Sequence, residues 1–206
     1  MRPHSNCFFR VHHGAPYRNM PLKKNIIELT RISTDDYRQA PKLPVALMAD
    51  NVRSMHNIGS MLRTCDAFSV EEMIMCGISG TPPHPEISKT ALGADRSVRW
   101  RHADDAFAEA VRLREEGWKV LALEQAHDSV ELADFEPVAG ERYLLVAGNE
   151  VDGVDQRIVD IADTVLEIPQ SGTKHSLNVA VSAGIALFHL FTALSFKNLP
   201  ETASQS

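Results

Sequence analysis

The sequence predicts an α/β fold in which a mostly parallel β-sheet is covered by helices on both faces. From residue 45 onward, short apolar segments alternate with longer helical stretches, which is typical of successive β-α-β units. Strands of this uniformly apolar kind favour a parallel sheet that is buried on both sides. At 206 residues the chain suits one domain with a short appendage.

The expected elements follow in order along the chain. A short helix is expected around residues 24–30 and a second after the capping residues Ser33, Thr34 and Asp35. Strands are expected at 45–49, 73–76, 119–123, 143–147 and 164–168, and helices at 55–67, 104–116, 154–161 and 178–196. We therefore divide the chain into a basic, partly disordered N-terminal extension (1–43), a main domain (44–199) and a tail (200–206).

Composition bounds the class of protein. The net charge of −6 means that contact with a nucleic acid would have to come from local basic clusters. The three cysteines form no CxxC pair, which argues against a disulfide framework or a zinc knuckle and fits a reducing cytoplasm. The histidines are scattered, so no metal site is expected, and the N-terminus lacks the apolar stretch of a secretory signal.

The segment 177–196 contains no formally charged residue and is long enough to cross a bilayer. Its polar residues fall near one helical face, however, and small residues keep the helix slim. A close-packed internal helix or a subunit-contact helix is therefore favoured over a membrane span, and we expect no membrane partner.

Polar residues follow several of the expected strands directly. Asp50-Asn51, Gly77, Gly148-Asn149-Glu150 and Pro169-Gln170 all stand at such places. Parallel α/β sheets bind ligands beyond the carboxyl ends of their strands, so a site is expected there. Neither G-x-G-x-x-G nor G-x-x-x-x-G-K-[ST] is present, so the phosphate cradles of dinucleotide and P-loop proteins are missing.

Three segments could carry chemistry, and each has a plain structural alternative. In the first, Asn57 and Arg63 could approach one ligand from the same helix, or could be a capping and a surface residue. In the second, 148–154, glycines flank an Asn-Glu pair in a tight turn, which could hold a cofactor or simply precede a helix. In the third, 168–178, Ser176 and Asn178 could cap a helix whose amides could also receive a carboxylate or phosphate.

Taken together and in this order, the three segments resemble the SpoU/TrmH branch of the SPOUT class of methyltransferases. That branch has an Asn followed six residues later by Arg, a Gly-Asn-Glu-x-x-Gly turn and an Ile-Pro-x-x-Gly-x-x-x-Ser-Leu-Asn-Val loop. The matching residues here are Asn57, Arg63, Gly148, Asn149, Glu150, Gly153, Ile168, Pro169, Gly172, Ser176, Leu177, Asn178 and Val179. The resemblance covers roughly residues 44–197. Gln170 departs from it, since many members have Met there.

The resemblance implies a C-terminal trefoil knot that holds S-adenosylmethionine, and a homodimer with its active site at the subunit boundary. It implies transfer of a methyl group to a ribose 2′-hydroxyl of tRNA or rRNA, and we favour tRNA for a compact member. By position, the cofactor-binding residues would be Gly148, Ile168, Gly172 and Leu177. The catalytic group would be Asn57, Arg63, Glu150, Ser176 and Asn178.

Arg63 would grip the phosphate beside the target ribose, because a guanidinium stays protonated and is a poor base. Contacts to RNA are expected from the N-terminal extension and from Arg53, Lys89, Arg96, Arg99, Arg101 and Lys174.

Three alternatives stay open from the sequence. The first is a catalytically inactive RNA-binding protein of the same fold, against which the intact Arg63, Glu150 and Asn178 speak. The second is a methyltransferase of this class that acts on a base, whereas the Ser-Leu-Asn loop favours ribose. The third is a small-molecule α/β enzyme, which the acidic composition leaves open.

Overall fold

The structure, a computed structural model, describes residues 23–24 and 32–197. The chain divides into two compact units, Met1–Ile32 and Ser33–Ser206, and the fold below is that of the second unit. The helix expected around residues 24–30 and the tail from residue 200 lie outside the described residues. The helix expected after Ser33 is present as α1 (Thr34–Gln39), and the Ser33 hydroxyl caps it by accepting from the Asp36 amide.

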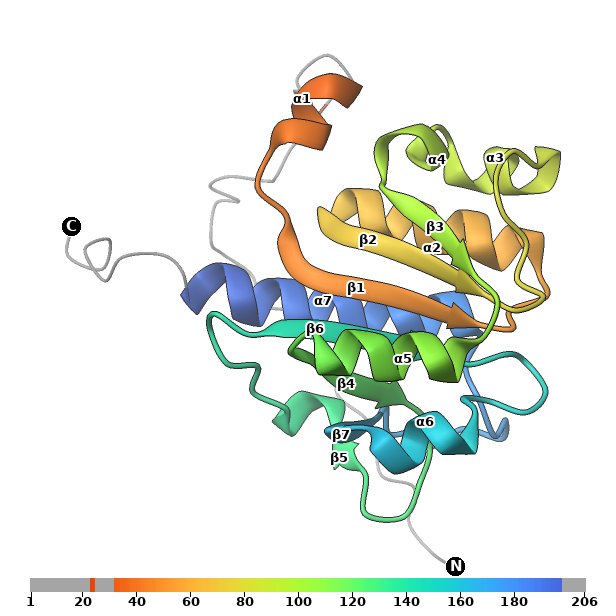
Figure 1. Cartoon of the computed structure of the whole chain (residues 1–206), viewed down its shortest axis with the longest axis vertical. Helices are drawn as coiled ribbons and strands as arrows, with labels where there is room; N and C mark the ends of the chain where they lie inside the picture. The colour runs from red at the N-terminus through yellow and green to blue at the C-terminus, as the bar shows by residue number, and fades with distance from the viewer. Residues whose placement is uncertain (1–22, 25–31, 198–206) are drawn as a thin grey trace, which may run out of the picture. The chain divides into compact units, whose positions relative to one another are not determined.

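A single parallel sheet forms the centre of the described unit (Figure 1). Its strand order is β3-β2-β1-β6-β4-β7-β5, and every neighbouring pair runs parallel. The strands are β1 (Leu43–Asp50), β2 (Val70–Cys76), β3 (Trp100–Ala103), β4 (Trp118–Leu123), β5 (Val130–Glu131), β6 (Arg142–Ala147) and β7 (Thr164–Glu167). The predicted fold class is confirmed, and the sheet is entirely rather than mostly parallel.

The central strand β1 shows how the sheet is buried on both faces. Leu43, Val45, Leu47 and Ala49 belong to one hydrophobic cluster, whereas Ala46 and Met48 belong to a second. Successive side chains of a strand point to opposite faces, so a continuous apolar run supplies both clusters. The uniformly apolar composition of this segment therefore follows directly from its place in the middle of the sheet.

Helices cover the two faces in two groups. On one face lie α2 (Met55–Ala67), α3 (Pro85–Ala91), α4 (Ala94–Ser97) and α7 (Val179–Lys197). On the other lie α5 (Ala106–Glu115) and α6 (Gln156–Ile161), which Figure 1 shows in front of the sheet, with α2 and α7 behind it. The two-sided covering expected from the sequence is confirmed.

Helix α7 buries a face of alanine and leucine against the sheet. Ala183, Ala186, Leu187, Leu190 and Leu194 are at most 2% exposed. Each buried leucine stabilises the fold by about 1.5–3 kcal/mol relative to an exposed one. Across residues 32–197, no helix is both long enough and apolar enough to cross a membrane.

The sequence reading missed β3, α3, α4, β5 and the short 3₁₀ helix η1 (Leu132–Asp134). The edge strand β3 has the sequence Trp-Arg-His-Ala and none of its residues is fully buried, so it lacks an apolar run. Helix α3 has only seven residues and therefore shows little periodicity, although Pro85 at its first turn is a start signal. The His84 side chain caps this helix by accepting from the Glu86 amide.

Gly59 allows α3 to approach α2 closely. A Cβ atom at Gly59 would lie 2.4 Å from the Ile87 carbonyl oxygen and 2.0 Å from the Thr90 hydroxyl oxygen. The approach therefore serves helix packing, because the two helices could not lie this close with any other residue at position 59.

Candidate active site

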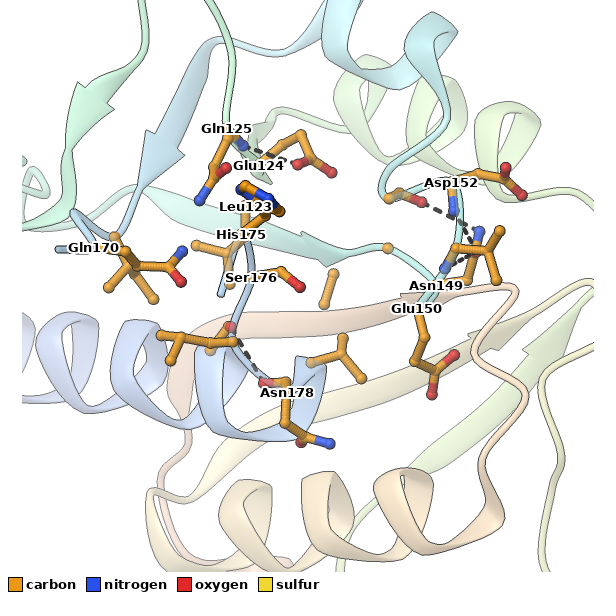
Figure 2. Close-up of a pocket in the computed structure, with 18 of the residues that line it drawn as sticks. Leu123, Glu124, Gln125, Asn149, Glu150, Asp152, Gln170, His175, Ser176 and Asn178 are labelled. Atoms are coloured by element: carbon orange, nitrogen blue, oxygen red, sulfur yellow. Dashed lines mark hydrogen bonds between the residues drawn. The ribbon is translucent and has the colours of Figure 1, made fainter. Parts of the chain in front are cut away.

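A cavity of about 550 Å³ lies beyond the carboxyl ends of β4, β6 and β7 (Figure 2). Its wall is formed by the end of β4, the turn after β6, the segment after β7 and the start of α7. The lining residues include Leu123, Glu124, Gln125, Gly148, Asn149, Glu150, Asp152, Ile168, Gln170, His175, Ser176, Leu177 and Asn178. The sequence-based expectation of a site at this edge of the sheet is met by a cavity of the size that cofactors occupy.

The predicted turn after β6 is closed by its own hydrogen bonds. The Asn149 and Gly153 backbones exchange two hydrogen bonds of 3.1 and 3.2 Å. The Asn149 side-chain oxygen also accepts from the Val151 and Asp152 amides at 2.9 Å each. These bonds explain the Asn in the Gly-Asn-Glu motif, because its side chain holds the turn that presents Glu150.

Gly148 begins this turn in a position where only glycine fits. A Cβ atom there would lie 2.0 Å from the Gly153 carbonyl carbon and 2.1 Å from the Val154 nitrogen. Both contacts are to backbone atoms, which cannot swing aside as a flexible side chain can. The two ends of the turn can therefore touch only because position 148 lacks a side chain.

Three predicted catalytic residues are joined by hydrogen bonds. The Asn57 side-chain nitrogen donates to Glu150 Oε1 at 2.7 Å, and the Asn178 side-chain nitrogen donates to Asn57 Oδ1 at 3.1 Å. Asn57 comes from α2, Glu150 from the turn after β6 and Asn178 from the residue before α7. The fold thus brings together side chains that are 93 and 121 residues apart in the chain.

The orientation of Asn178 follows from its second role as the cap of α7. Its Oδ1 accepts from the Ala180 amide at 3.0 Å and from the Val181 amide at 3.3 Å. Since the oxygen faces the helix, the side-chain NH₂ group is directed toward Asn57. Capping and site formation, two alternatives from the sequence, are therefore both present in this one residue.

The other predicted site residues stand apart from this chain of hydrogen bonds. Arg63 is exposed on α2, and within residues 32–197 it has no hydrogen bond or ion pair. Ser176 and Leu177 are exposed and line the cavity, as does the half-buried Ile168. Gly172 is exposed, is absent from the cavity wall, and a Cβ atom there would meet nothing within 4 Å.

The charge of the cavity wall is negative. Glu124, Glu150 and Asp152 line it together with His175, and no lysine or arginine of the described part of the chain does so. In Figure 2, Glu150 and Asp152 lie on the right of the cavity, and Glu124 lies above Ser176 and Asn178. Such a wall attracts a ligand that carries a positive centre.

The basic residues expected to contact RNA fall into two groups. Arg53, Lys89, Arg96 and Lys174 are exposed and have no ion-pair partner among residues 32–197. Arg99 and Arg101 instead pair with the buried Glu72 at 3.8 and 3.3 Å, and Arg101 also pairs with Glu109. Hydrogen bonds and ion pairs with these carboxylates raise the pKa of Arg101 despite its partial burial. The Arg101 guanidinium is therefore engaged in ion pairs within the fold and is not available to contact RNA.

The model of the SpoU rRNA methylase family matches residues 44–188, which is most of the chain. The chain belongs to this family. The family assignment confirms the resemblance drawn from the three motifs. The deep trefoil knot that this resemblance implies stays a prediction.

Relatives within the SpoU family include enzymes that act on different RNAs. The chain is 31% identical over 179 residues to a Vibrio parahaemolyticus protein named 23S rRNA (guanosine-2′-O-)-methyltransferase RlmB, covering 85% of this chain and 70% of that protein. It is also similar to the structure of the A. aeolicus TrmH/SpoU tRNA modifying enzyme, with a TM-score of 0.70 and 26% identity over 82% of this chain and 88% of that one.

A third SpoU-type structure is that of an AdoMet-bound rRNA methyltransferase from Sinorhizobium meliloti. The similarity has a TM-score of 0.68 and 26% identity, and it covers 80% of this chain and 61% of that one.

Sequence reasoning missed the part of this SpoU-type site that follows β4. Leu123, Glu124 and Gln125 line the cavity, and the Glu124 carboxylate accepts hydrogen bonds from the Val154 and Gln125 amides at 2.9 Å each. These two residues could have been predicted from their position, because Glu124 and Gln125 directly follow an expected strand. The rule that pointed to residues 148–150 applies equally to them.

Proposed function

We propose that this chain transfers a methyl group from S-adenosylmethionine to a ribose 2′-hydroxyl of RNA. The observation that carries the proposal is the hydrogen-bonded set Asn57, Glu150 and Asn178 at the edge of the cavity. All three belong to the motifs of the SpoU family, and a relative in that family is named a guanosine-2′-O-methyltransferase.

The residues around the cavity suit S-adenosylmethionine, which supplies a methyl group on a positively charged sulfur. Gly148, Ile168 and Leu177 would border the cofactor, while Glu124, Glu150 and Asp152 complement its positive centre. Gly172 does not line the cavity, so it would contribute only by allowing the backbone path of the loop that borders the cofactor. The AdoMet-bound structure of the S. meliloti relative supports this choice of cofactor.

The protein's own contribution is alignment and charge stabilisation. Asn57 and Asn178 hold fixed orientations, and Ser176 offers an exposed hydroxyl; together they would orient the 2′-hydroxyl for in-line attack. The exposed guanidinium of Arg63 has no partner among residues 32–197. It would bind the adjacent phosphate and stabilise negative charge that develops on the ribose oxygen.

Arg63→Lys tests this role of the guanidinium. The variant keeps the positive charge but loses the two-pronged geometry that matches a phosphate, so we expect the turnover number to fall about 100-fold. Calorimetry should show unchanged binding of S-adenosylmethionine, because Arg63 does not line the cavity. Near-wild-type turnover of Arg63→Lys would exclude the proposed phosphate contact.

We further propose tRNA as the substrate rather than rRNA. The similarity to the A. aeolicus TrmH/SpoU tRNA modifying enzyme supports this choice. The methyltransferase domain would comprise residues 44–199, with the basic extension 1–43 assisting RNA binding. A cytoplasmic location fits the free, buried Cys65 and Cys76.

Incubation with methyl-labelled S-adenosylmethionine and separated tRNA and rRNA fractions tests the proposed function. Nucleoside analysis of labelled tRNA should yield a 2′-O-methylnucleoside. A labelled base would favour a base-directed enzyme, and label in rRNA alone would overturn the choice of tRNA. No transfer to either RNA, in a protein that still binds RNA, would favour the inactive RNA-binding alternative.

The exposed face of α7 supports a homodimer. Val181, Ile185 and Phe188 are 50, 41 and 56% exposed and recur at helical spacing next to Asn178. A row of exposed apolar side chains on a helix is typical of a protein contact, and two copies of α7 could cover each other. The proposed active site would then lie at the subunit boundary.

Phe188→Glu tests this contact. The buried charge should shift the protein from dimer to monomer in light scattering after size exclusion, with a dissociation constant at least about 100-fold higher. Val138→Glu is the matched control, since Val138 is 55% exposed on a loop outside α7. A wild-type monomer, or equal behaviour of both variants, would contradict the α7 contact.

A further inference from the structure

The turn after β6 is held from both sides by carboxylates of the neighbouring strands. In the sheet, β6 lies between β1 and β4. Asp50 ends β1, and its Oδ2 accepts from the Asp155 amide at 3.0 Å. Glu124 follows β4, and its Oε2 accepts from the Val154 amide at 2.9 Å. Two consecutive amides at the end of the turn are therefore fixed by side chains from opposite sides.

Asp50 is buried, being only 2% exposed, and it does not line the cavity. Burial raises the pKa of its carboxyl group, and the nearby Asp155 and Asp105 add to this effect, against the hydrogen bonds it accepts. Asp50 has no ion-pair partner among residues 32–197; Arg157 pairs with Asp155 instead. A buried carboxylate costs free energy, so its presence points to a structural task that it performs.

Both oxygens of each carboxylate are occupied by N–H donors. Asp50 Oδ1 accepts from the Asn51 side chain at 2.8 Å, while Glu124 Oε1 accepts from the Gln125 amide at 2.9 Å. A side-chain amide offers only one oxygen, so Asn at position 50 or Gln at position 124 would leave one of two donors without an acceptor. The two positions thus require carboxylates.

Gly153 makes room for the contact from the β4 side. A Cβ atom at this position would lie 2.1 Å from Glu124 Oε2, and the backbone φ of +72° is one that glycine adopts without strain. The last Gly of the Gly-Asn-Glu-x-x-Gly motif is therefore explained by Glu124, a residue outside all three motifs.

We propose that Asp50 and Glu124 are positioning residues that fix the turn from Gly148 to Asp155, and so direct Glu150 toward Asn57 and the cavity. The proposal rests on the proposed function only for the identity of the cofactor. Asp50 can affect the cavity only by holding the turn, because Asp50 is buried and does not line the cavity. Glu124 holds the turn and also forms part of the cavity wall.

Asp50→Asn and Glu124→Gln test the proposal by two measurements. Hydrogen exchange of peptides that span residues 148–155 should become at least about 10-fold faster, because a hydrogen bond to a charged group is lost in each variant. Calorimetry should show a Kd for S-adenosylmethionine that is raised about 10-fold or more. Neither effect requires a known RNA substrate.

Glu72→Gln is the matched control. Glu72 is a 7% exposed carboxylate on β2 that pairs with Arg101 and does not contact the turn. Its substitution removes the same charge and destabilises the fold, but exchange in 148–155 and the Kd should stay within about twofold of wild type.

The outcomes separate the proposal from the proposed function. Wild-type exchange in the turn of Asp50→Asn and Glu124→Gln, or an equal effect of Glu72→Gln, would overturn the positioning role. If Asp50→Asn fails to fold, Glu124→Gln still tests the positioning role, because Glu124 is only half-buried and its substitution should disturb folding less. A wild-type protein that binds no S-adenosylmethionine would contradict the proposed function, while the exchange measurement would still test the turn.

Discussion

Asn57→Asp is expected to lower the rate of methyl transfer by about 100-fold, the loss typical of a misplaced catalytic group. Asn57 donates to Glu150 and accepts from Asn178, so it requires one donor and one acceptor on the same side chain. Aspartate keeps the acceptor but places a second carboxylate against Glu150. The two negative groups would separate, and Glu150 would leave the position that the turn gives it.

Single-turnover kinetics with saturating cofactor and RNA measure this loss directly. Binding of S-adenosylmethionine should weaken much less than the rate falls, since Asn57 itself does not line the cavity and the turn keeps its backbone hydrogen bonds. Asn57→Ala is the useful comparison, because it removes both hydrogen bonds without adding repulsion and should therefore be less damaging. If Asn57→Asp turned over like the wild type, the hydrogen-bonded set could not be the catalytic group.

Gly148→Ala is expected to abolish measurable cofactor binding, with affinity reduced by at least about 100-fold. The added methyl group would overlap the backbone of Gly153 and Val154, so the two ends of the turn would have to move apart. Overpacking of this kind costs about 1–3 kcal/mol of folding stability and would also displace Glu150. Calorimetry and thermal unfolding measure the two effects separately.

Gly172→Ala is the matched control, because the sequence assigned both glycines to the cofactor site. A Cβ atom at Gly172 meets nothing within 4 Å, so stability should stay within about 0.5 kcal/mol of wild type. Equal loss of affinity in both variants would show that the open position of Gly172 does not persist when the cofactor binds.

The central elements were predictable because their residues are uniform in character. The expected strands at 45–49 and 143–147 fall within β1 and β6, and the helix expected at 55–67 coincides with α2. Helix α6 instead begins at Gln156, two residues later than expected. The amides of Val154 and Asp155 are taken by Glu124 and Asp50, and no local pattern reveals such partners.

The site was predictable in its motifs but not in its contacts. The family resemblance placed Asn57, Glu150 and Asn178 in one group, and the fold joins them. The resemblance also placed Arg63 there, whereas the single chain leaves that guanidinium exposed and without a hydrogen bond among residues 32–197. Contacts across 93 or 121 residues depend on how strands pair and helices pack, which periodicity alone does not determine.

The position of α7 at the end of the described chain has a consequence for biosynthesis. Its leucines complete the hydrophobic cluster on one face of β1 and β6, and every strand precedes it in the sequence. A nascent chain on the ribosome would therefore hold a finished set of strands whose one face is covered by α2, α3 and α4 but is still exposed where α7 packs. Chaperones would find a binding surface on that exposed part until α7 emerges and covers it.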